Sequence, residues 1–414
     1  MARIRPFRAY RYSPAAGPAG DLVTQPYDKI SPAMQARYLS LSPYNLVRII
    51  LGPKLETDSG SDNVYTRAAS YFRQWMEQGI LVQEPAPALF AYFQEFTVPD
   101  TGAAAVRKGF IGLGAVEDYS AGVVHRHEQT LSGPKKDRME VLEHTRAHFG
   151  QIFMLYPDRE GEVDRLLDEC SAAEPLTEVT DEYGTVHRLW RISEPARIER
   201  IQCLMADKKL VIADGHHRYE TALAFRQEHP ELEGAAWVMM TFVNMYSPGL
   251  KILATHRVLS GLAGFSVDRF TAAAREHFEV RELASVDELR AAFAEPHAGR
   301  IRIGAAAEGG RRVLLLERSR KPGDLDVALL HSILIQQVLG IGEEAVREEK
   351  HIRYIRGLEA AVEEVAGGAT LAFLLEPTPI EDVAETSFAG RVMPQKSTDF
   401  YPKLLSGLTI YRVE

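Results

Sequence analysis

The fold is decided by the stretch 210-LVIADGHHRYETAL-223. Its apolar, β-branched first part predicts a strand, Asp214-Gly215 predicts a tight turn, and the apolar residues that recur after His216 predict a helix. A helix that starts directly after a strand presents unpaired N–H groups and the positive end of its dipole. The turn is therefore predicted to receive an anion, with Asp214 and Arg218 adding one carboxylate and one cation.

Helical and strand patterns alternate on both sides of this stretch, which predicts a mixed α/β fold. We expect helices at 32–41, 63–78, 196–205, 267–278, 286–294, 325–338 and 358–366, and strands at 46–51, 151–156, 188–192, 236–243, 300–305 and 312–318. A turn at 99–102 predicts a hairpin between strands 89–98 and 107–116, and 174–184 is expected to be a linker. We divide the chain into three regions, 1–150, 151–262 and 263–414.

Composition limits the class of protein. The 48 Lys and Arg residues against 57 Asp and Glu residues give a net charge of −9, which argues against general binding to nucleic acid or anionic lipid. Cys170 and Cys203 are too few for a disulfide framework, so a reducing, cytoplasmic location is expected. No secretory signal and no run of about 18 apolar residues is found, so no membrane span is expected. The oligomeric state stays open, with a homodimer as one option.

A second polar stretch combines His125, His127 and Glu128 with the basic cluster 135–138. Imidazoles and a carboxylate are ordinary zinc ligands, but no third histidine follows at a suitable spacing. A phosphate-handling interpretation fits better, with Glu128 as a general base and Lys136 and Arg138 neutralising phosphoryl oxygens. A solvated turn before a helix is the structural alternative.

Three further groups are candidates for a pocket. Polar side chains held between turns near the N-terminus, and a Thr-His-Arg triplet, are predicted to bind substrate: Asp28, Asn45, Arg48, His256 and Arg257. For Asp28, Asn45 and Arg48 the alternative is that they belong to ordered connections between elements, and for His256 it is a packed and hydrogen-bonded role. The loop before the last strand is rich in hydroxyl groups and lysines, and Lys396, Ser397, Thr398 and Lys403 are predicted to bind phosphate or a carboxylate. A solvated surface loop is the alternative.

The hexapeptide 213-ADGHHR-218 resembles the signature of the ParB/sulfiredoxin-like superfamily, which includes partition-type CTP-binding proteins, sulfiredoxin and free-serine kinases. The resemblance extends over the chain through Pro26-Tyr27-Asp28, His127-Glu128 with Thr130, Lys136-Asp137-Arg138, Thr255-His256-Arg257 and 394–403. This full pattern is similar to domain of unknown function family 1015. The hexapeptide is specific to the superfamily and not to one reaction.

The resemblance implies a ParB/sulfiredoxin-like α/β core at 151–262 with extensions on both sides. It implies that Gly215 and Arg218 bind nucleotide phosphates, that Asp214 lies near Mg²⁺ or the substrate hydroxyl, and that Glu128 is the base. His216 and His217 belong to the implied catalytic set. The chain departs from sulfiredoxin because residue 216 is not cysteine, and from partition proteins because it lacks their Glu-Arg-Arg turn and DNA-binding helix.

Together these observations predict a nucleotide-dependent phosphotransferase. ATP or ADP, with CTP as an option, would donate a phosphoryl group in the presence of Mg²⁺ to a small hydroxylated metabolite, with free serine as the best single guess. The same residues working in reverse would hydrolyse phosphoserine. The competing hypothesis is a nucleotide-switched binding protein without catalysis.

Overall fold

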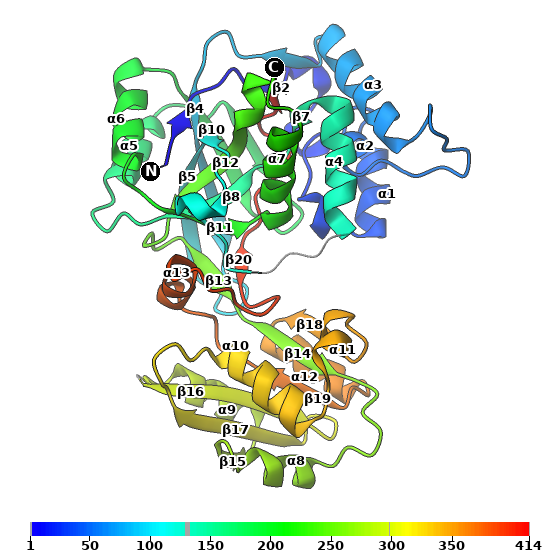
Figure 1. The fold of residues 1–414 in the computed structure, drawn as a ribbon, viewed down its shortest axis with the longest axis vertical. Coiled ribbons are helices and arrows are strands. Elements are labelled where there is room, and N and C mark those ends of the chain that lie inside the picture. The colour runs from blue at the N-terminus through cyan, green and yellow to red at the C-terminus, as the bar shows by residue number, and fades with distance from the viewer. Residues whose placement is uncertain (1, 129–132, 298, 414) are drawn as a thin grey trace. The chain divides into compact units, whose positions relative to one another are not determined.

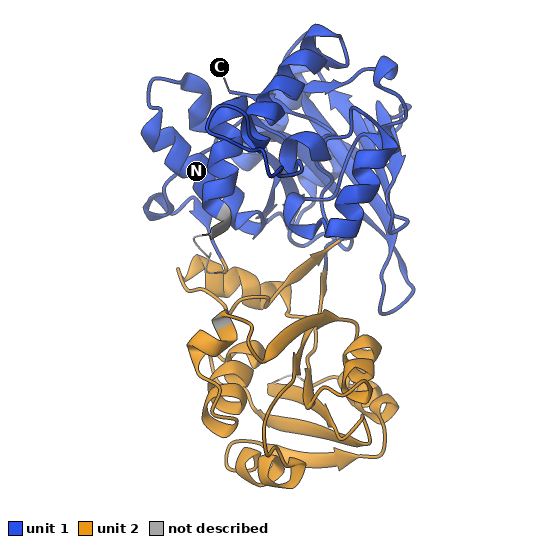
Figure 2. Cartoon of the chain, turned by 90° about the vertical axis from the view of Figure 1, so that its right-hand side faces the viewer, with its two compact units in different colours: residues 1–126, 130–251, 402–414 blue, residues 127–129, 252–401 orange. Residues whose placement is uncertain are grey.

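A computed structural model of the chain describes residues 2–128, 133–297 and 299–413 (Figure 1). Thr130, which belongs to the family pattern quoted above, lies outside the described residues. The chain forms two compact units, shown in different colours in Figure 2. Unit 1 comprises residues 1–126, 130–251 and 402–414, and unit 2 comprises residues 127–129 and 252–401.

Unit 1 is built on a nine-stranded mixed sheet. Its strands run in the order β6-β11-β8-β12-β5-β4-β10-β9, and β1 pairs with β5. The pairs β11–β6 and β12–β8 are parallel, whereas the remaining pairs are antiparallel. The bounds are β1 Ile4–Arg5, β4 Leu89–Thr97, β5 Ala104–Ala115, β6 Val124–His125, β8 Ile152–Tyr156, β9 Thr177–Thr180, β10 Val186–Ile192, β11 Leu210–Asp214 and β12 Trp237–Asn244.

Helices cover this sheet and build two apolar cores. One core joins the sheet to α5 (Glu162–Cys170), α6 (Pro195–Met205) and α7 (His216–Glu228). The other joins α2 (Val47–Ile50), α3 (Val64–Glu77) and α4 (Gly133–Thr145). Unit 1 also contains α1 (Pro32–Leu41) and the short pairs β2 (Tyr10–Tyr12) with β3 (Leu81–Gln83) and β7 (Ala147–His148) with β21 (Tyr411–Arg412).

Unit 2 contains a six-stranded antiparallel sheet in the order β15-β17-β16-β19-β14-β18. Its strands are β14 Thr255–Leu259, β15 Glu279–Leu283, β16 Arg300–Ala307, β17 Arg312–Ser319, β18 Ile352–Arg356 and β19 Leu371–Leu374, and β13 (Lys251–Leu253) pairs with β20 (Asp399–Tyr401). The helices are α8 Val267–Ala274, α9 Val286–Ala294, α10 Asp326–Leu329, a π-helix Leu330–Val338, α11 Glu343–Arg347, α12 Leu358–Ala366 and α13 Ile380–Phe388. Side chains of α9 and α12 form an apolar core with the sheet.

The α/β class predicted from the sequence is confirmed, and α1, α3 and the 89–115 hairpin form where expected. Asn63 caps the N-terminus of α3, where its side chain accepts hydrogen bonds from the backbone of Tyr65 and Thr66, and the apolar residues Ala68, Phe72 and Trp75 of this helix are buried.

Several predicted elements are wrong. Residues 47–50 form helix α2 in place of a strand, because the Asn45 side chain accepts a hydrogen bond from the backbone N–H of Val47 at its first turn. The expected linker at 174–184 contains strand β9, which pairs with β10. The three predicted regions also differ from the two units observed, since β4 and β5 of the first region share one sheet with β12 of the second.

Candidate active site

The site is centred on the turn between β11 and α7 in unit 1. Gly215 occupies this turn with φ of 92°, a conformation that side chains rarely adopt. A Cβ atom at residue 215 would lie 3.0 Å from both Cζ and Nε of Arg218. The glycine is therefore required twice, once by the backbone and once because the Arg218 guanidinium packs against it.

Asp214 is held between two cations. Its Oδ2 accepts a hydrogen bond from Arg218 Nη2 at 2.6 Å, and its Oδ1 lies 3.4 Å from Lys403 Nζ. Burial alone would raise the pKa of the carboxyl, but Lys403, Arg218, Lys29 and His216 together hold it far below its usual value. The carboxylate is thus ionised at any physiological pH and is a very weak base.

Arg218 has little freedom to move. Its Nη1 donates to the backbone carbonyl of Gln151, and its side chain is only 14% exposed. The same guanidinium also binds Asp214 and packs on Gly215, so its position is fixed by the protein and does not depend on a ligand.

Sequence reasoning missed Arg107, on strand β5. Its side chain is among the most completely buried in the protein, with a residue exposure of 1%. Nε and Nη2 donate to Gln94 Oε1, and Nη2 also donates to the carbonyl of Pro402. Burial lowers the pKa of Arg107 to about 9, so it stays charged at neutral pH, and Asp214 is near enough to raise that pKa. Within the described part of the chain, Arg107 Nη1 has no hydrogen-bond partner.

The backbone that carries Lys403 is fixed by the same strands. Gln94 Nε2 donates to the carbonyl of Lys403 at 2.8 Å, next to the Pro402 carbonyl that Arg107 binds. The β4–β5 hairpin therefore holds Lys403 in place through Gln94 and places the buried charge of Arg107 near Asp214.

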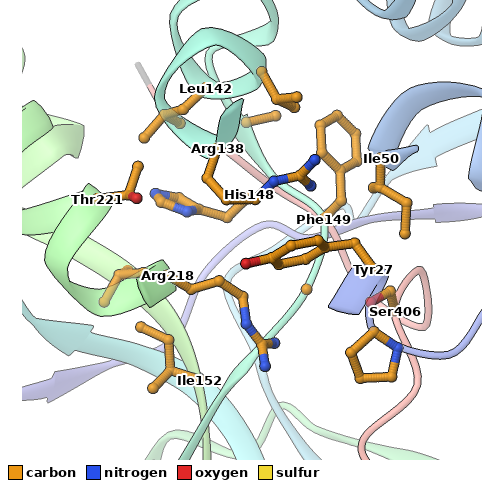
Figure 3. Close-up of a pocket in the computed structure, with 15 residues that line it drawn as sticks. Tyr27, Ile50, Arg138, Leu142, His148, Phe149, Ile152, Arg218, Thr221 and Ser406 are labelled. Atoms are coloured by element: carbon orange, nitrogen blue, oxygen red, sulfur yellow. The ribbon is translucent and has the colours of Figure 1, made fainter. Parts of the chain in front are cut away.

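A cavity of about 70 Å³ adjoins this cluster in unit 1. Figure 3 shows Arg138 and Arg218 on opposite sides of the Tyr27 ring, and Arg138 Cζ lies 3.9 Å from that ring's centroid. Burial raises the pKa of Tyr27, while the two arginines lower it. Burial also lowers the pKa of His148, a lining residue, to about 4. Apolar side chains complete the wall: Ile50, Val141, Leu142, Ala147, Phe149, Ile152 and Val238.

Other predicted residues of unit 1 lie near the turn or on its helices. His216 and His217 form the first turn of α7, and the His216 charge contributes to the low pKa of Asp214. Arg138 pairs with Asp137, whereas Lys136 is exposed on α4. Asp28 Oδ2 lies 3.6 Å from Lys29 Nζ, and its charge raises the pKa of the neighbouring Tyr27.

The structure gives two of the predicted substrate contacts a different role. Asn45 is fully buried and bonds the backbone of Asp21 and Val47. Arg48 donates to the carbonyls of Leu39 and Ser42. Both side chains are engaged with local backbone, so they support α1 and α2 and do not line the cavity.

The remaining predicted residues belong to unit 2. Glu128 Oε1 accepts a hydrogen bond from the backbone N–H of Lys396, and His127 Nε2 lies 2.7 Å from Thr398 Oγ1. Ser397 is buried and donates to the carbonyl of Pro394. His256 is buried, and its Nδ1 accepts a hydrogen bond from the backbone N–H of Leu375. This arrangement corresponds to the alternative in which His256 is a packed, hydrogen-bonded residue.

Arg218 and Lys403 contact the two carboxylate oxygens of Asp214, so a Mg²⁺ ion at this carboxylate would compete with both cations. Over residues 2–128, 133–297 and 299–413, no group of three or more His, Cys, Asp or Glu side chains is arranged to hold a metal ion. None of the helices described there is long and apolar enough to span a bilayer.

The sequence profile of the family described as "Protein of unknown function (DUF1015)" matches residues 4–334. No curated protein sequence matches the chain.

Among solved structures, a free serine kinase variant in complex with ADP is 16% identical, with 70% of this chain and 89% of that chain covered and a TM-score of 0.38. SbnI with a C-terminal truncation from Staphylococcus aureus is 10% identical, with coverages of 72% and 87% and a TM-score of 0.36. A conserved hypothetical protein from Pyrococcus furiosus is 15% identical, with coverages of 69% and 92% and a TM-score of 0.34. At these scores the likeness carries no argument about activity.

Proposed function

The chain belongs to the DUF1015 family, and we propose that it is a nucleotide-dependent phosphotransferase acting on a small hydroxylated metabolite, with free serine as the first candidate acceptor. The observation that carries the proposal is the charge balance around Asp214. Several cations act on this one carboxylate: Arg218 and Lys403 contact it, Lys29 and His216 act on it through their charge, and Asp214 in turn raises the pKa of Arg107. A cluster of cations of this kind is suited to a phosphate group, which carries a charge of about −2.

The preorganisation of these cations favours transfer over mere binding. Phosphoryl transfer depends mainly on positioning and on stabilising the charge of the equatorial oxygens. Arg218 and Arg107 are both fixed by backbone carbonyls before any ligand is present. They would meet the developing charge without first having to reorganise.

The proposed reaction joins the acceptor hydroxyl oxygen to the terminal phosphorus of the nucleotide and breaks the phosphoanhydride P–O bond. The nucleotide leaves with one phosphate fewer, and a base takes the hydroxyl proton. Asp214 is too weak a base because of its lowered pKa. Glu128 stays the proton acceptor that the resemblance to free-serine kinases implies, and Asp214 orients Arg218 and Lys403.

The test is ³¹P NMR of the purified protein with ATP or ADP and free serine, with and without Mg²⁺. We expect a new phosphomonoester signal, and a loss of rate of at least about a hundredfold in Asp214→Asn, because the two cations lose their shared anchor. The matched control is Asp168→Asn, which removes a carboxylate paired with Lys108 at 2.5 Å on the surface of unit 1. Full activity in Asp214→Asn would contradict the placement of the site.

Two other outcomes distinguish the alternatives. Release of inorganic phosphate from phosphoserine by the wild type, without nucleotide, would favour the hydrolytic direction. Tight nucleotide binding with no transfer to any hydroxylated acceptor would overturn the proposal in favour of a nucleotide-operated switch.

A further inference from the structure

A second buried arginine, Arg257 on β14, shapes the surroundings of Glu128 within unit 2. The residue is 1% exposed. Its Nη2 donates to the carbonyl of Lys396 at 3.0 Å and to that of Gln395 at 3.4 Å, and Nη1 donates to the carbonyl of Thr255. In the described part of the chain its hydrogen-bond acceptors are all backbone carbonyls. These contacts indicate that Arg257 supports the backbone and does not bind substrate.

The segment that Arg257 binds is the one that holds Glu128. The backbone N–H of Lys396 donates to Glu128 Oε1 at 2.9 Å. Three residues before Lys396, the N–H of Met393 donates to the carbonyl of His127 at 2.7 Å, and Glu128 and Met393 form a parallel bridge. Met393 therefore pairs with the backbone at His127 and Glu128, and Lys396 binds the Glu128 carboxylate.

This segment has an unfavourable backbone conformation. Lys396 has φ of 59°, in the left-handed region that is unfavourable for a residue with a side chain. Such a conformation persists only where the surroundings impose it. Arg257 provides part of that constraint, and Thr378 Oγ1 adds a hydrogen bond to the carbonyl of Ser397 at 2.9 Å.

Arg257 also acts on the carboxylate through its charge. Burial lowers the pKa of Arg257 to about 10, so it is a cation at neutral pH, and the negative charges of Asp326 and Glu128 raise that pKa. Its Tyr354 neighbour on β18 lies with its ring centroid 5.4 Å from Cζ. A buried cation that has no hydrogen-bonded carboxylate is costly, which argues for a role beyond packing.

We infer that Arg257 is a positioning residue: it fixes the left-handed Lys396 peptide and, through that N–H, the orientation of the Glu128 carboxylate. The catalytic part of this inference rests on the proposed function, since it assumes that Glu128 takes the proton. The structural part does not. It replaces the substrate-binding role that the sequence predicted for Arg257.

The first experiment needs no activity. Hydrogen exchange at the Lys396 amide, followed by mass spectrometry of the 393–398 peptide, should accelerate at least about tenfold in Arg257→Met and in Glu128→Ala. Arg257→Lys, which keeps a charged donor, should restore most of the protection. The control is Arg353→Met, which removes an exposed arginine of β18 that pairs with Glu364. Wild-type exchange in Arg257→Met would overturn the inference.

The second experiment reads the catalytic consequence. If the wild type transfers phosphate, Arg257→Met should lower kcat about tenfold to a hundredfold with an unchanged KM for nucleotide, because only the base is misplaced. Arg257→Lys should recover part of kcat. An equal rise in KM would assign Arg257 to ligand binding and contradict the positioning role. Absence of transfer in the wild type would remove the proposed function while the exchange result still decides the structural claim.

Discussion

Arg107 in unit 1 and Arg257 in unit 2 are both buried arginines that bind backbone carbonyls, but their charged neighbours differ in sign. Each is 1% exposed, lies on a strand of its unit's main sheet and binds backbone carbonyls of the C-terminal segment. Arg107 shares its surroundings with Asp214, which already has two cationic partners. Arg257 has two acidic neighbours, Asp326 and Glu128.

The difference assigns different chemistry to the two places. Unit 1 has an excess of positive charge around one carboxylate and is suited to an anion. Around Arg257 the excess is negative, which suits a group that holds or accepts a proton. A buried arginine does not by itself indicate an anion site, and the count of its charged neighbours decides what it can do.

The sharpest way to break this comparison is to remove each arginine and measure anion binding. Arg107→Met should weaken the binding of inorganic pyrophosphate about tenfold to a hundredfold in calorimetry, since a charge-assisted hydrogen bond contributes about 1.5–3 kcal/mol. Arg257→Met should leave that affinity within about twofold of wild type. An equal loss of pyrophosphate affinity in both variants would show that the charged neighbours of the two arginines do not decide which of them binds an anion.

The sequence was sufficient for the local part of the site and insufficient for the long-range part. Asp214 and Arg218 are four residues apart across a strand–helix turn, so local patterning predicts their contact. Arg107 reads as an ordinary strand residue, because its burial depends on Gln94 across the hairpin and on Pro402, which lies 295 residues away. Local patterns also cannot predict that residues 127–129 belong to unit 2 and that residues 402–414 belong to unit 1.

The polar residues Asn45 and Arg48 illustrate the opposite error. Their residue types suit a pocket, but their partners are the backbone atoms of Asp21, Val47, Leu39 and Ser42. A sequence lists side chains and does not reveal which unpaired backbone groups those side chains must satisfy.

Acidification should affect the two units with opposite signs. His148 in unit 1 has a pKa of about 4 in the folded protein, below its ordinary 6.5. Its contribution to stability is therefore fully present above pH 6.5 and is lost as the pH falls toward 4. Burial raises the pKa of Asp326 in unit 2 from 3.8 to about 6, so the cost of ionising it is relieved as pH falls through 6.

The measurement is urea unfolding at pH 7 and pH 5. Between pH 7 and pH 5, protonation of His148 should lower the free energy of unfolding of the wild type by about 2 kcal/mol, and His148→Asn should abolish this loss. Protonation of Asp326 should raise it by about 1 kcal/mol, and Asp326→Asn should abolish this gain. The two variants would then differ from wild type in opposite directions. Shifts of the same sign would show that one of these groups has an ordinary pKa in the folded protein.

The smallest expected effect tests whether the anion site in unit 1 depends on the shape of a single turn. Gly215 and Gly184 both have positive φ, 92° and 78°, but a Cβ at residue 184 would meet nothing within 4 Å, whereas one at residue 215 would meet the Arg218 guanidinium at 3.0 Å. Alanine at either position should cost about 1 kcal/mol of stability through backbone strain. Only Gly215→Ala should also weaken pyrophosphate binding, by a few fold, because Arg218 must move away from Asp214. If Gly184→Ala weakened binding equally, the effect would come from general strain in unit 1, and the packing of Arg218 on Gly215 would have no part in holding the anion.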